Sequence, residues 1–127
     1  MRDVLRKIDC VMVRVDDLSA AEGFYSRLLG LRALWRDESS VGMGMPETDA
    51  EVVLHTMDLP PEWNVYYLVD DVLAAVAEST AAGCAVLRTP FEIAVGWGAV
   101  LADPFGNPVG ILDLTKGLRT GQVSGPE

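Results

Sequence analysis

Basic side chains are scarce in this chain of 127 residues: 10 lysines and arginines stand against 19 aspartates and glutamates, for a formal charge of −9. Because a protein needs a basic face to bind phosphates, this balance argues against nucleic acid as a partner. It argues equally against an anionic membrane surface. The surplus of acid is compatible with a cationic ligand, although acidic surfaces more often serve solubility alone.

Cysteine and histidine are also rare, with two cysteines and one histidine. Cys10 and Cys84 each fall within an apolar run and lack the spacing of a disulfide framework, so we expect two free thiols. No apolar stretch reaches the roughly 18 residues that span a bilayer. Residues 1–14 are mixed and charged, unlike a signal peptide. We therefore expect a cytoplasmic protein without a membrane partner.

The length and the apolar content predict a single domain over residues 1–127. Half of the residues are hydrophobic, which is enough for a core without disulfides or metal ions. An internal echo then divides this domain into two similar halves. Residues 14–21 read RVDDLSAA and residues 68–75 read LVDDVLAA, so the two copies start about 54 residues apart.

Each copy predicts a strand, a helix and three further strands. Ser19 with Glu22 is typical of a capping box that starts a helix over 19–29, and Asp70 or Asp71 caps the second helix, which ends at Ala82. A glycine follows each helix. Strands are expected near 8–15, 31–37, 40–45 and 50–57 in the first copy, and near 65–69, 84–88, 97–102 and 108–114 in the second.

These elements predict an α+β fold made of two tandem βαβββ repeats, about 6–58 and 62–115, joined at Pro60-Pro61. The two sheets should form a curved mixed-sheet cup with the helices outside. A cup at a repeat interface is a usual place for a small ligand. The tail, 116–127, has lost its periodicity and is expected to fray.

Four motifs, in this order, resemble the vicinal-oxygen-chelate superfamily of glyoxalases, bleomycin-resistance proteins and extradiol dioxygenases. They are Val15-Asp16-Asp17-Leu18, Phe24-Tyr25, Leu28-Leu29-Gly30-Leu31 and the final turn Asp103-Pro104-Phe105-Gly106-Asn107. The final turn is the most specific of the four. The resemblance covers residues 8–115 and implies the same cup-shaped fold of paired repeats.

The resemblance also implies where a metal ion would be bound, namely by one residue on the first and last strand of each repeat. The matching positions are Cys10, Leu54, Asn64 and Gly110. Leucine and glycine offer no ligand, and one cysteine with an asparagine cannot hold a divalent ion. A slip of one residue would bring in His55, but it would also move that side chain to the other face of the sheet. We therefore predict no metal ion and no cofactor.

Among family members, the chain resembles most the metal-free bleomycin-resistance proteins, which sequester a drug as dimers and share a Trp-Gly before the last turn. This resemblance implies a homodimer that binds or sequesters a drug or metabolite, aromatic or cationic. Strand alternation and the Trp-Gly motif give the predicted ligand-binding residues, which are Cys10, Met12, Arg14, Leu54, Asn64, Tyr66, Trp97 and Gly110.

Two other interpretations stay open from the sequence. The chain could be an atypical lyase or isomerase that works without metal through Arg14, His55, Tyr66 or Cys10, although the missing metal ligands weigh against catalysis. It could also be a non-catalytic subunit whose acidic surface or tryptophans face another protein. Trp35 and Trp63 are expected in the core or at a dimer seam.

Overall fold

The computed structural model describes residues 4–117, and its elements follow the order that the sequence predicts. The elements of the first repeat are β1 (Lys7–Arg14), α1 (Leu18–Arg27), β2 (Arg32–Arg36), β3 (Ser40–Met45) and β4 (Thr48–His55). Those of the second repeat are β5 (Val65–Leu68), α2 (Val72–Ala81), β6 (Ala85–Ile93), β7 (Gly96–Ala102) and β8 (Pro108–Leu112).

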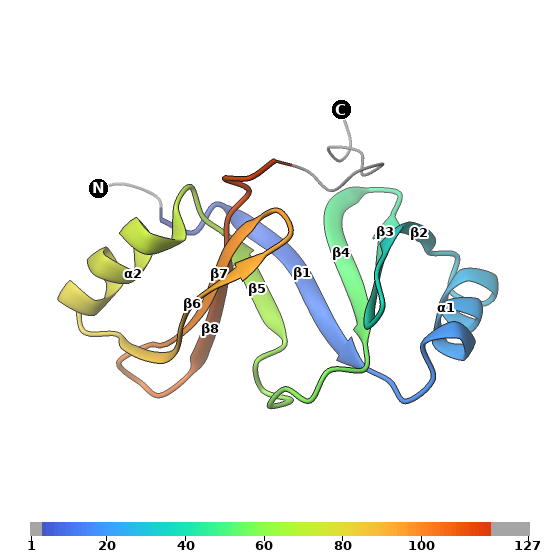
Figure 1. Ribbon diagram of the computed structural model, residues 1–127, viewed down its shortest axis with the longest axis horizontal. Helices are drawn as coiled ribbons and strands as arrows, with labels where there is room; N and C mark the ends of the chain where they lie inside the picture. The colour runs from blue at the N-terminus through green and yellow to red at the C-terminus, as the bar shows by residue number, and fades with distance from the viewer. Residues whose placement is uncertain (1–3, 118–127) are drawn as a thin grey trace.

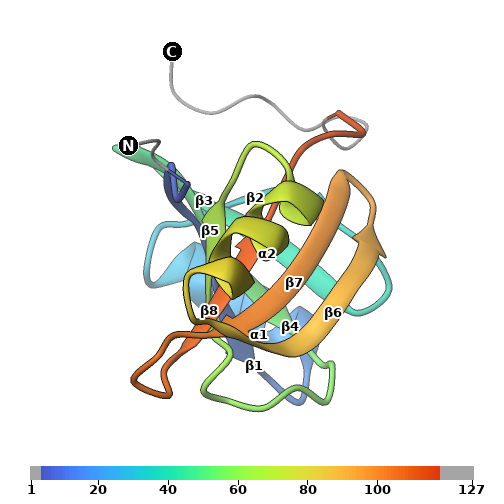
Figure 2. The ribbon, with the colours of Figure 1, turned by 90° about the vertical axis from the view of Figure 1, so that its left-hand side faces the viewer.

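The strands form one mixed sheet in the order β2-β3-β4-β1-β5-β8-β7-β6. Each repeat contributes four neighbouring strands, and its first and last strands pair in parallel, β1 with β4 and β5 with β8. The two repeats meet where β1 and β5 pair antiparallel. The sheet curves strongly, with both helices on its outer side (Figures 1 and 2), which confirms the predicted α+β cup.

The second aspartate of each Asp-Asp pair caps the helix that follows it. The carboxylates of Asp17 and Asp71 accept hydrogen bonds of 3.0 Å from the amides of Ala20 and Ala74. The predicted capping box at Ser19 is therefore wrong, because the helix already starts at Leu18. Glu22 instead forms an ion pair with Arg36 of β2.

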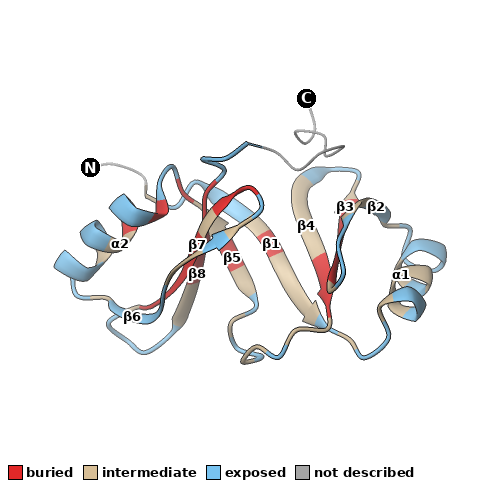
Figure 3. Cartoon of the chain, in the orientation of Figure 1, coloured by how far each residue is buried: buried red, intermediate tan, exposed pale blue. Residues whose placement is uncertain are grey.

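The buried residues form three clusters, two beneath the helices and one on the concave face. Figure 3 colours the buried residues red along the chain. The cluster beneath α1 is built on Val41, Met43 and Leu54. The cluster beneath α2 includes Val72, Ala99 and Ile111. The concave cluster is Cys10, Val53, Tyr66, Val100 and Leu112, and it joins the two repeats. The helices thus fix the outer face of the sheet and leave the concave face to a different set of side chains.

One buried carboxylate ties three elements together. Asp113, 1% exposed, follows β8 and accepts hydrogen bonds from the amide of Val72 at 2.8 Å and the amide of Trp97 at 2.9 Å. The hydroxyl of Thr115 donates a third at 2.9 Å. Burial alone would raise the pKa of Asp113, but these hydrogen bonds outweigh it and lower the pKa below its usual value. The second repeat is therefore held by an ionised carboxylate at its core.

The first two residues of the predicted tail make backbone hydrogen bonds. The amide of Lys116 still donates a hydrogen bond to the carbonyl of Val95 at 2.8 Å, and that of Gly117 donates to Leu114 at 2.9 Å. The rest of the predicted tail, 118–127, lies outside the described residues. Neither α1 nor α2, the helices of the described region, is long and apolar enough to cross a membrane.

Candidate ligand-binding cavity

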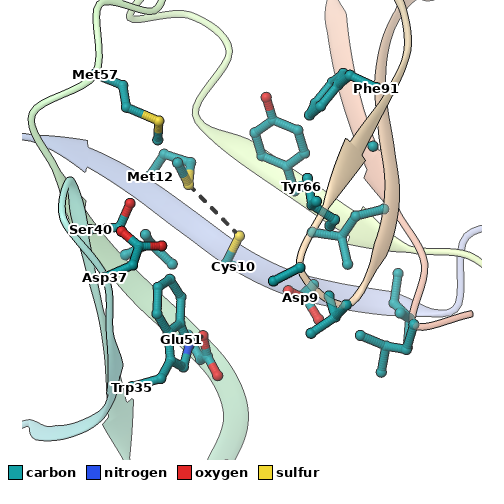
Figure 4. Close-up of a pocket in the computed structure, with 18 of the residues that line it drawn as sticks. Asp9, Cys10, Met12, Trp35, Asp37, Ser40, Glu51, Met57, Tyr66 and Phe91 are labelled. Carbon is teal, nitrogen blue, oxygen red and sulfur yellow. Dashed lines mark hydrogen bonds between the residues drawn. The ribbon is translucent and has the colours of Figure 1, made fainter. Parts of the chain in front are cut away.

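The concave face of the sheet holds a cavity of about 460 Å³. Strands from both repeats line it, and apolar side chains dominate its wall. In the view of Figure 4, Asp9, Glu51 and Trp35 lie on the lower side, and Met57, Tyr66 and Phe91 on the upper side. The cavity is therefore large enough for a small organic molecule and has an acidic end and an aromatic end.

Three aromatic rings of the cavity each lie on a glycine of the neighbouring strand. The pairs are Trp35 with Gly42, Tyr66 with Gly110, and Phe91 with Gly98, and in each the two residues are directly opposite in the sheet register. A Cβ on Gly98 would lie 2.7 Å from the Phe91 ring, and one on Gly110 would lie 2.7 Å from the Tyr66 ring. Because the glycines have no side chain, the three rings can lie flat along the concave surface, where they form part of the cavity wall.

This packing of rings on glycines predicts that substitutions at Trp35 and Gly42 have non-additive effects on the free energy of unfolding. A Cβ on Gly42 would overlap the indole, and Trp35 supplies all three of its nearest neighbours. Gly42→Ala should lower the free energy of unfolding by about 1–3 kcal/mol through overpacking and shift the tryptophan emission. In Trp35→Ala the same glycine substitution should cost much less, as a urea-unfolding double-mutant cycle would show. Additive effects would mean that the ring does not rest on this glycine.

Two carboxylates occupy the acidic end. Glu51 of β4 accepts a hydrogen bond of 2.8 Å from the indole nitrogen of Trp35. Burial, and next the charge of Glu51, raise the pKa of Asp9 from 3.8 to about 6. Lys7 lowers it only in part, and Lys7 forms its ion pair with Asp49. Asp9 is therefore a carboxylate whose charge the surrounding protein compensates poorly.

Cys10 lies beside this pair, and its sulfur is 4.0 Å from the sulfur of Met12. Burial, reinforced by the charges of Asp9 and Glu51, raises the pKa of the Cys10 thiol well above its usual value. Burial also raises the pKa of the Tyr66 hydroxyl. Both groups therefore stay protonated near neutral pH and act as walls of the cavity, not as nucleophile and base.

A basic side chain already lies at the aromatic end. The guanidinium carbon of Arg88, on β6, is 3.7 Å from the centre of the Phe91 ring. This is the geometry of a cation–π contact. The ring of Phe91 therefore lies between Gly98 and the guanidinium of Arg88.

The structure separates the predicted ligand-binding residues into two groups. Cys10, Met12 and Tyr66 line the cavity, and Gly110 lies beneath the Tyr66 ring. Arg14, Asn64 and Trp97 are not among the residues that line it. Arg14 is exposed and pairs with Asp16, Asn64 is exposed, and Trp97 packs with the cluster beneath α2.

The sequence predicts Leu54 on the concave face, and this assignment is wrong by one residue. Leu54 is fully buried beneath α1, whereas Glu51 and Val53 of the same strand line the cavity. The assignment of Leu54 aligned the turn before β4 with the turn before β8 and counted the same number of residues forward from each. The first turn is two residues long and the second five, so the count reached the wrong face.

His55 and Arg14 are not among the residues that line the cavity. The ring of His55 is buried, and its Nδ1 accepts a hydrogen bond of 3.1 Å from the amide of Met57. Burial, together with the charge of Arg14, lowers the pKa of His55. This histidine is thus a neutral structural residue.

A divalent metal ion does not fit the donor atoms of the cavity. On β5 and β8 the residues that border the cavity are Tyr66, Leu68 and Leu112, which supply no carboxylate, imidazole or thiol. Between residues 4 and 117 no three histidine, cysteine, aspartate or glutamate side chains come together in a way that could hold an ion. The Tyr66 ring fills the space above Gly110, where the resemblance implies a ligand.

The sequence reasoning missed Asp9, Trp35, Glu51 and Phe91 as cavity residues. Asp9 and Glu51 could have been recognised, because each is a charged residue directly beside the apolar run of its strand, and burying a charge is costly. Trp35 and Phe91 carried a weaker signal, since the pairs 35/42 and 91/98 have the same spacing in both repeats. No sequence pattern showed that the rings would lie on those glycines.

Comparison with known proteins gives a consistent picture. A family model described as the glyoxalase/bleomycin resistance protein/dioxygenase superfamily matches residues 7–111. CFP32, named as a candidate glyoxylase in Mycobacterium tuberculosis and Mycobacterium bovis, is 47% identical over 49 residues. That match covers 38% of this chain and 19% of CFP32, so the chain aligns with less than a quarter of these relatives.

Solved structures share the fold at low sequence identity. Methylmalonyl-CoA epimerase from Mycobacterium tuberculosis has a TM-score of 0.76 at 12% identity, covering 94% of this chain and 93% of the epimerase. A Mn(II)-bound glyoxalase from Novosphingobium aromaticivorans has a TM-score of 0.62 at 23% identity, covering 95% of this chain and 43% of the glyoxalase. At these identities the likeness establishes the arrangement of strands and helices and leaves the chemistry to the residues of the cavity.

Proposed function

Because the chain belongs to the glyoxalase/bleomycin resistance protein/dioxygenase superfamily, we propose that it uses the cup of that fold to bind a small organic molecule without a metal ion or cofactor. In this role it sequesters a drug or a metabolite. The observation that carries the proposal is the paved cavity, in which Trp35, Tyr66 and Phe91 lie on glycines and offer ring faces to a ligand. Such a surface suits an organic molecule better than an ion.

Ligand binding is tested by titrating the protein with a library of aromatic compounds and following tryptophan emission. We expect quenching with micromolar or tighter binding, since Trp35 borders the cavity. Trp35→Phe should remove most of the quenching, whereas Trp97→Phe, on the other face of the sheet, should keep it. A broad library without a hit would contradict the proposal.

Independence from metal is tested by elemental mass spectrometry of untagged protein, with thermal unfolding in nickel, zinc, manganese and iron(II). We expect substoichiometric metal and no rise in melting temperature, because the second repeat offers no donor set. One tightly held ion per chain would overturn this part of the proposal.

A second candidate function is a metal-independent isomerase or lyase. The feature in its favour is Asp9, which lines the cavity together with Glu51 and whose pKa, raised by burial to about 6, suits a general base near neutral pH. Such a reaction would exchange a carbon-bound proton of the substrate with solvent. Deuterium uptake from D₂O into a bound ligand, lost in Asp9→Asn, would favour this function over sequestration.

We also propose a homodimer that works in the cytoplasm. The outer edge of β6 has no neighbouring strand in the described part of the chain, and Val86 and Leu87 on it are 36% and 44% exposed. An exposed apolar edge of this kind favours association. Light scattering after gel filtration checks the dimer.

The cytoplasmic location rests on the cysteines. Cys10 and Cys84 are both free, which suits a reducing compartment.

A further inference from the structure

The cavity wall contains two basic side chains, and they differ in their partners. Lys7 forms an ion pair with Asp49. Arg88 makes no ion pair or hydrogen bond with its side chain to any residue of the described part of the chain. Glu92, which follows on the same strand, pairs with Lys116 instead. The positive charge of Arg88 is therefore available to a ligand.

The ring of Phe91 holds the charge of Arg88 within the cavity. The guanidinium carbon lies 3.7 Å from the ring centre, and the ring in turn lies on Gly98. All three residues line the cavity. A ring face attracts a guanidinium through its charge and does not occupy all five of its N–H donors. The contact thus positions the guanidinium and leaves donors for a ligand.

The hydroxyl of Tyr66 is a second donor at the same end. Tyr66 is 6% exposed, and its hydroxyl makes no hydrogen bond within residues 4–117, which is unusual for a buried polar group. In Figure 4 this hydroxyl points to the side of the cavity where Phe91 lies. Burial, and next Cys10, raise the pKa of the hydroxyl, and the charge of Arg88 lowers it in part, so the guanidinium lies nearby.

From these two donors we propose that the ligand is an organic acid with a flat apolar body, whose carboxylate is bound by the guanidinium of Arg88 and the hydroxyl of Tyr66. The inference rests on the proposed function and adds the chemical class of the ligand. A guanidinium matches a carboxylate with two parallel N–H···O bonds. The body of the acid lies against apolar side chains of the wall, such as Met12 and Leu112.

The acidic end of the cavity does not oppose this assignment. In Figure 4 Asp9 and Glu51 lie on the opposite side of the cavity from the Tyr66 hydroxyl. Burial is the main influence on the pKa of both Asp9 and Tyr66, but the charge of Arg88 acts on Tyr66 alone of the two. Charges interact less with distance and are screened by salt. An acid group at Arg88 therefore meets a positive charge first, even in a chain with a net charge of −9.

Three probes of one shape and three charges test the inference: 2-naphthoate, 2-naphthamide and 2-naphthamidine, titrated by isothermal calorimetry at pH 7.5. We expect the naphthoate to bind at least about tenfold more tightly than the amide, as one charge pair in a partly buried site can provide. The amidine, which is a cation, should bind more weakly than the amide.

Variants of the two donors show which groups recognise the acid. Arg88→Gln should remove the preference for the naphthoate and leave amide binding within about twofold. Tyr66→Phe keeps the ring and removes one donor, so it should lower the preference by about fivefold, since a hydrogen bond to a charged group is stronger than one to a neutral group. Arg14→Gln removes an exposed arginine that pairs with Asp16 outside the cavity, and should change neither affinity.

The outcomes separate the two proposals. Equal binding of naphthoate and amide, or tighter binding of the amidine, overturns the acid and leaves the organic ligand standing. A preference for the naphthoate that persists in both Arg88→Gln and Tyr66→Phe overturns the assigned donors. If no naphthyl probe binds, acidic hits from the library screen replace the naphthoate in the same variants, hits without an acid group overturn the acid alone, and a screen without hits overturns the acid and the binding function together. Circular dichroism confirms that each variant is folded before titration.

Discussion

Asp113→Ala is expected to lower the free energy of unfolding by about 3–5 kcal/mol, because it leaves two buried amides and a hydroxyl without their acceptor. The amides are those of Val72, at the start of α2, and Trp97, in β7. For a domain of this size such a loss lowers the melting temperature by about 10–20 °C. Urea unfolding and calorimetry of both proteins give the measurement.

A matched control is available in the turn before β8. Asp103 accepts hydrogen bonds from the amides of Phe105 and Asn107, at 2.9 and 2.8 Å, but lies where water can replace it. Asp103→Ala should therefore cost clearly less than Asp113→Ala, although the two carboxylates accept similar bonds. Equal losses would show that the burial of Asp113 adds nothing.

The contribution of Asp113 also has a defined dependence on pH. Its pKa is lowered in the folded protein, so its stabilisation is complete above the unfolded pKa of about 3.9 and is lost as pH falls through the lower folded value. The difference between wild type and Asp113→Ala should therefore stay constant from pH 8 to pH 5. It should shrink only in stronger acid.

The fold was predictable because its signals are local and repeated. The Asp-Asp pairs at 16–17 and 70–71 and the glycines at 30 and 83 mark the same boundaries twice, and each repeat confirms the other. Capping was less certain because Asp17 and Ser19 are both good N-cap residues, and only the tertiary path of the chain decides which is used.

The cavity was harder to predict because its composition depends on register across strands. A strand has a period of two, so an error of one residue at β4 replaced Glu51 and Val53 by Leu54. Hydrogen bonds between distant residues, such as that from Trp35 to Glu51, are also absent from any local pattern. Gly110 was read as a lost ligand, whereas the structure shows that Tyr66 requires a glycine there.

Asp9→Asn is expected to stabilise the protein, and more strongly at neutral pH than in acid. The pKa of Asp9 is raised from 3.8 to about 6, so the folded state holds this proton more tightly than the unfolded chain does. Ionisation of Asp9 therefore penalises folding above pH 6, and the penalty fades as pH falls towards 3.8. After allowance for partial solvent access, Asn should add about 1–2 kcal/mol at pH 7.5. At pH 4.5 the gain should fall below half of that, as urea unfolding at both pH values would show.

The charged groups that act on Asp9 make the result interpretable. Glu51 and Asp49 raise its pKa, and Lys7 and a hydrogen bond from Cys10 lower it. Asp49→Asn, which removes the partner of Lys7, should give no such gain. If Asp9→Asn is destabilising at both pH values, Asp9 is a structural residue.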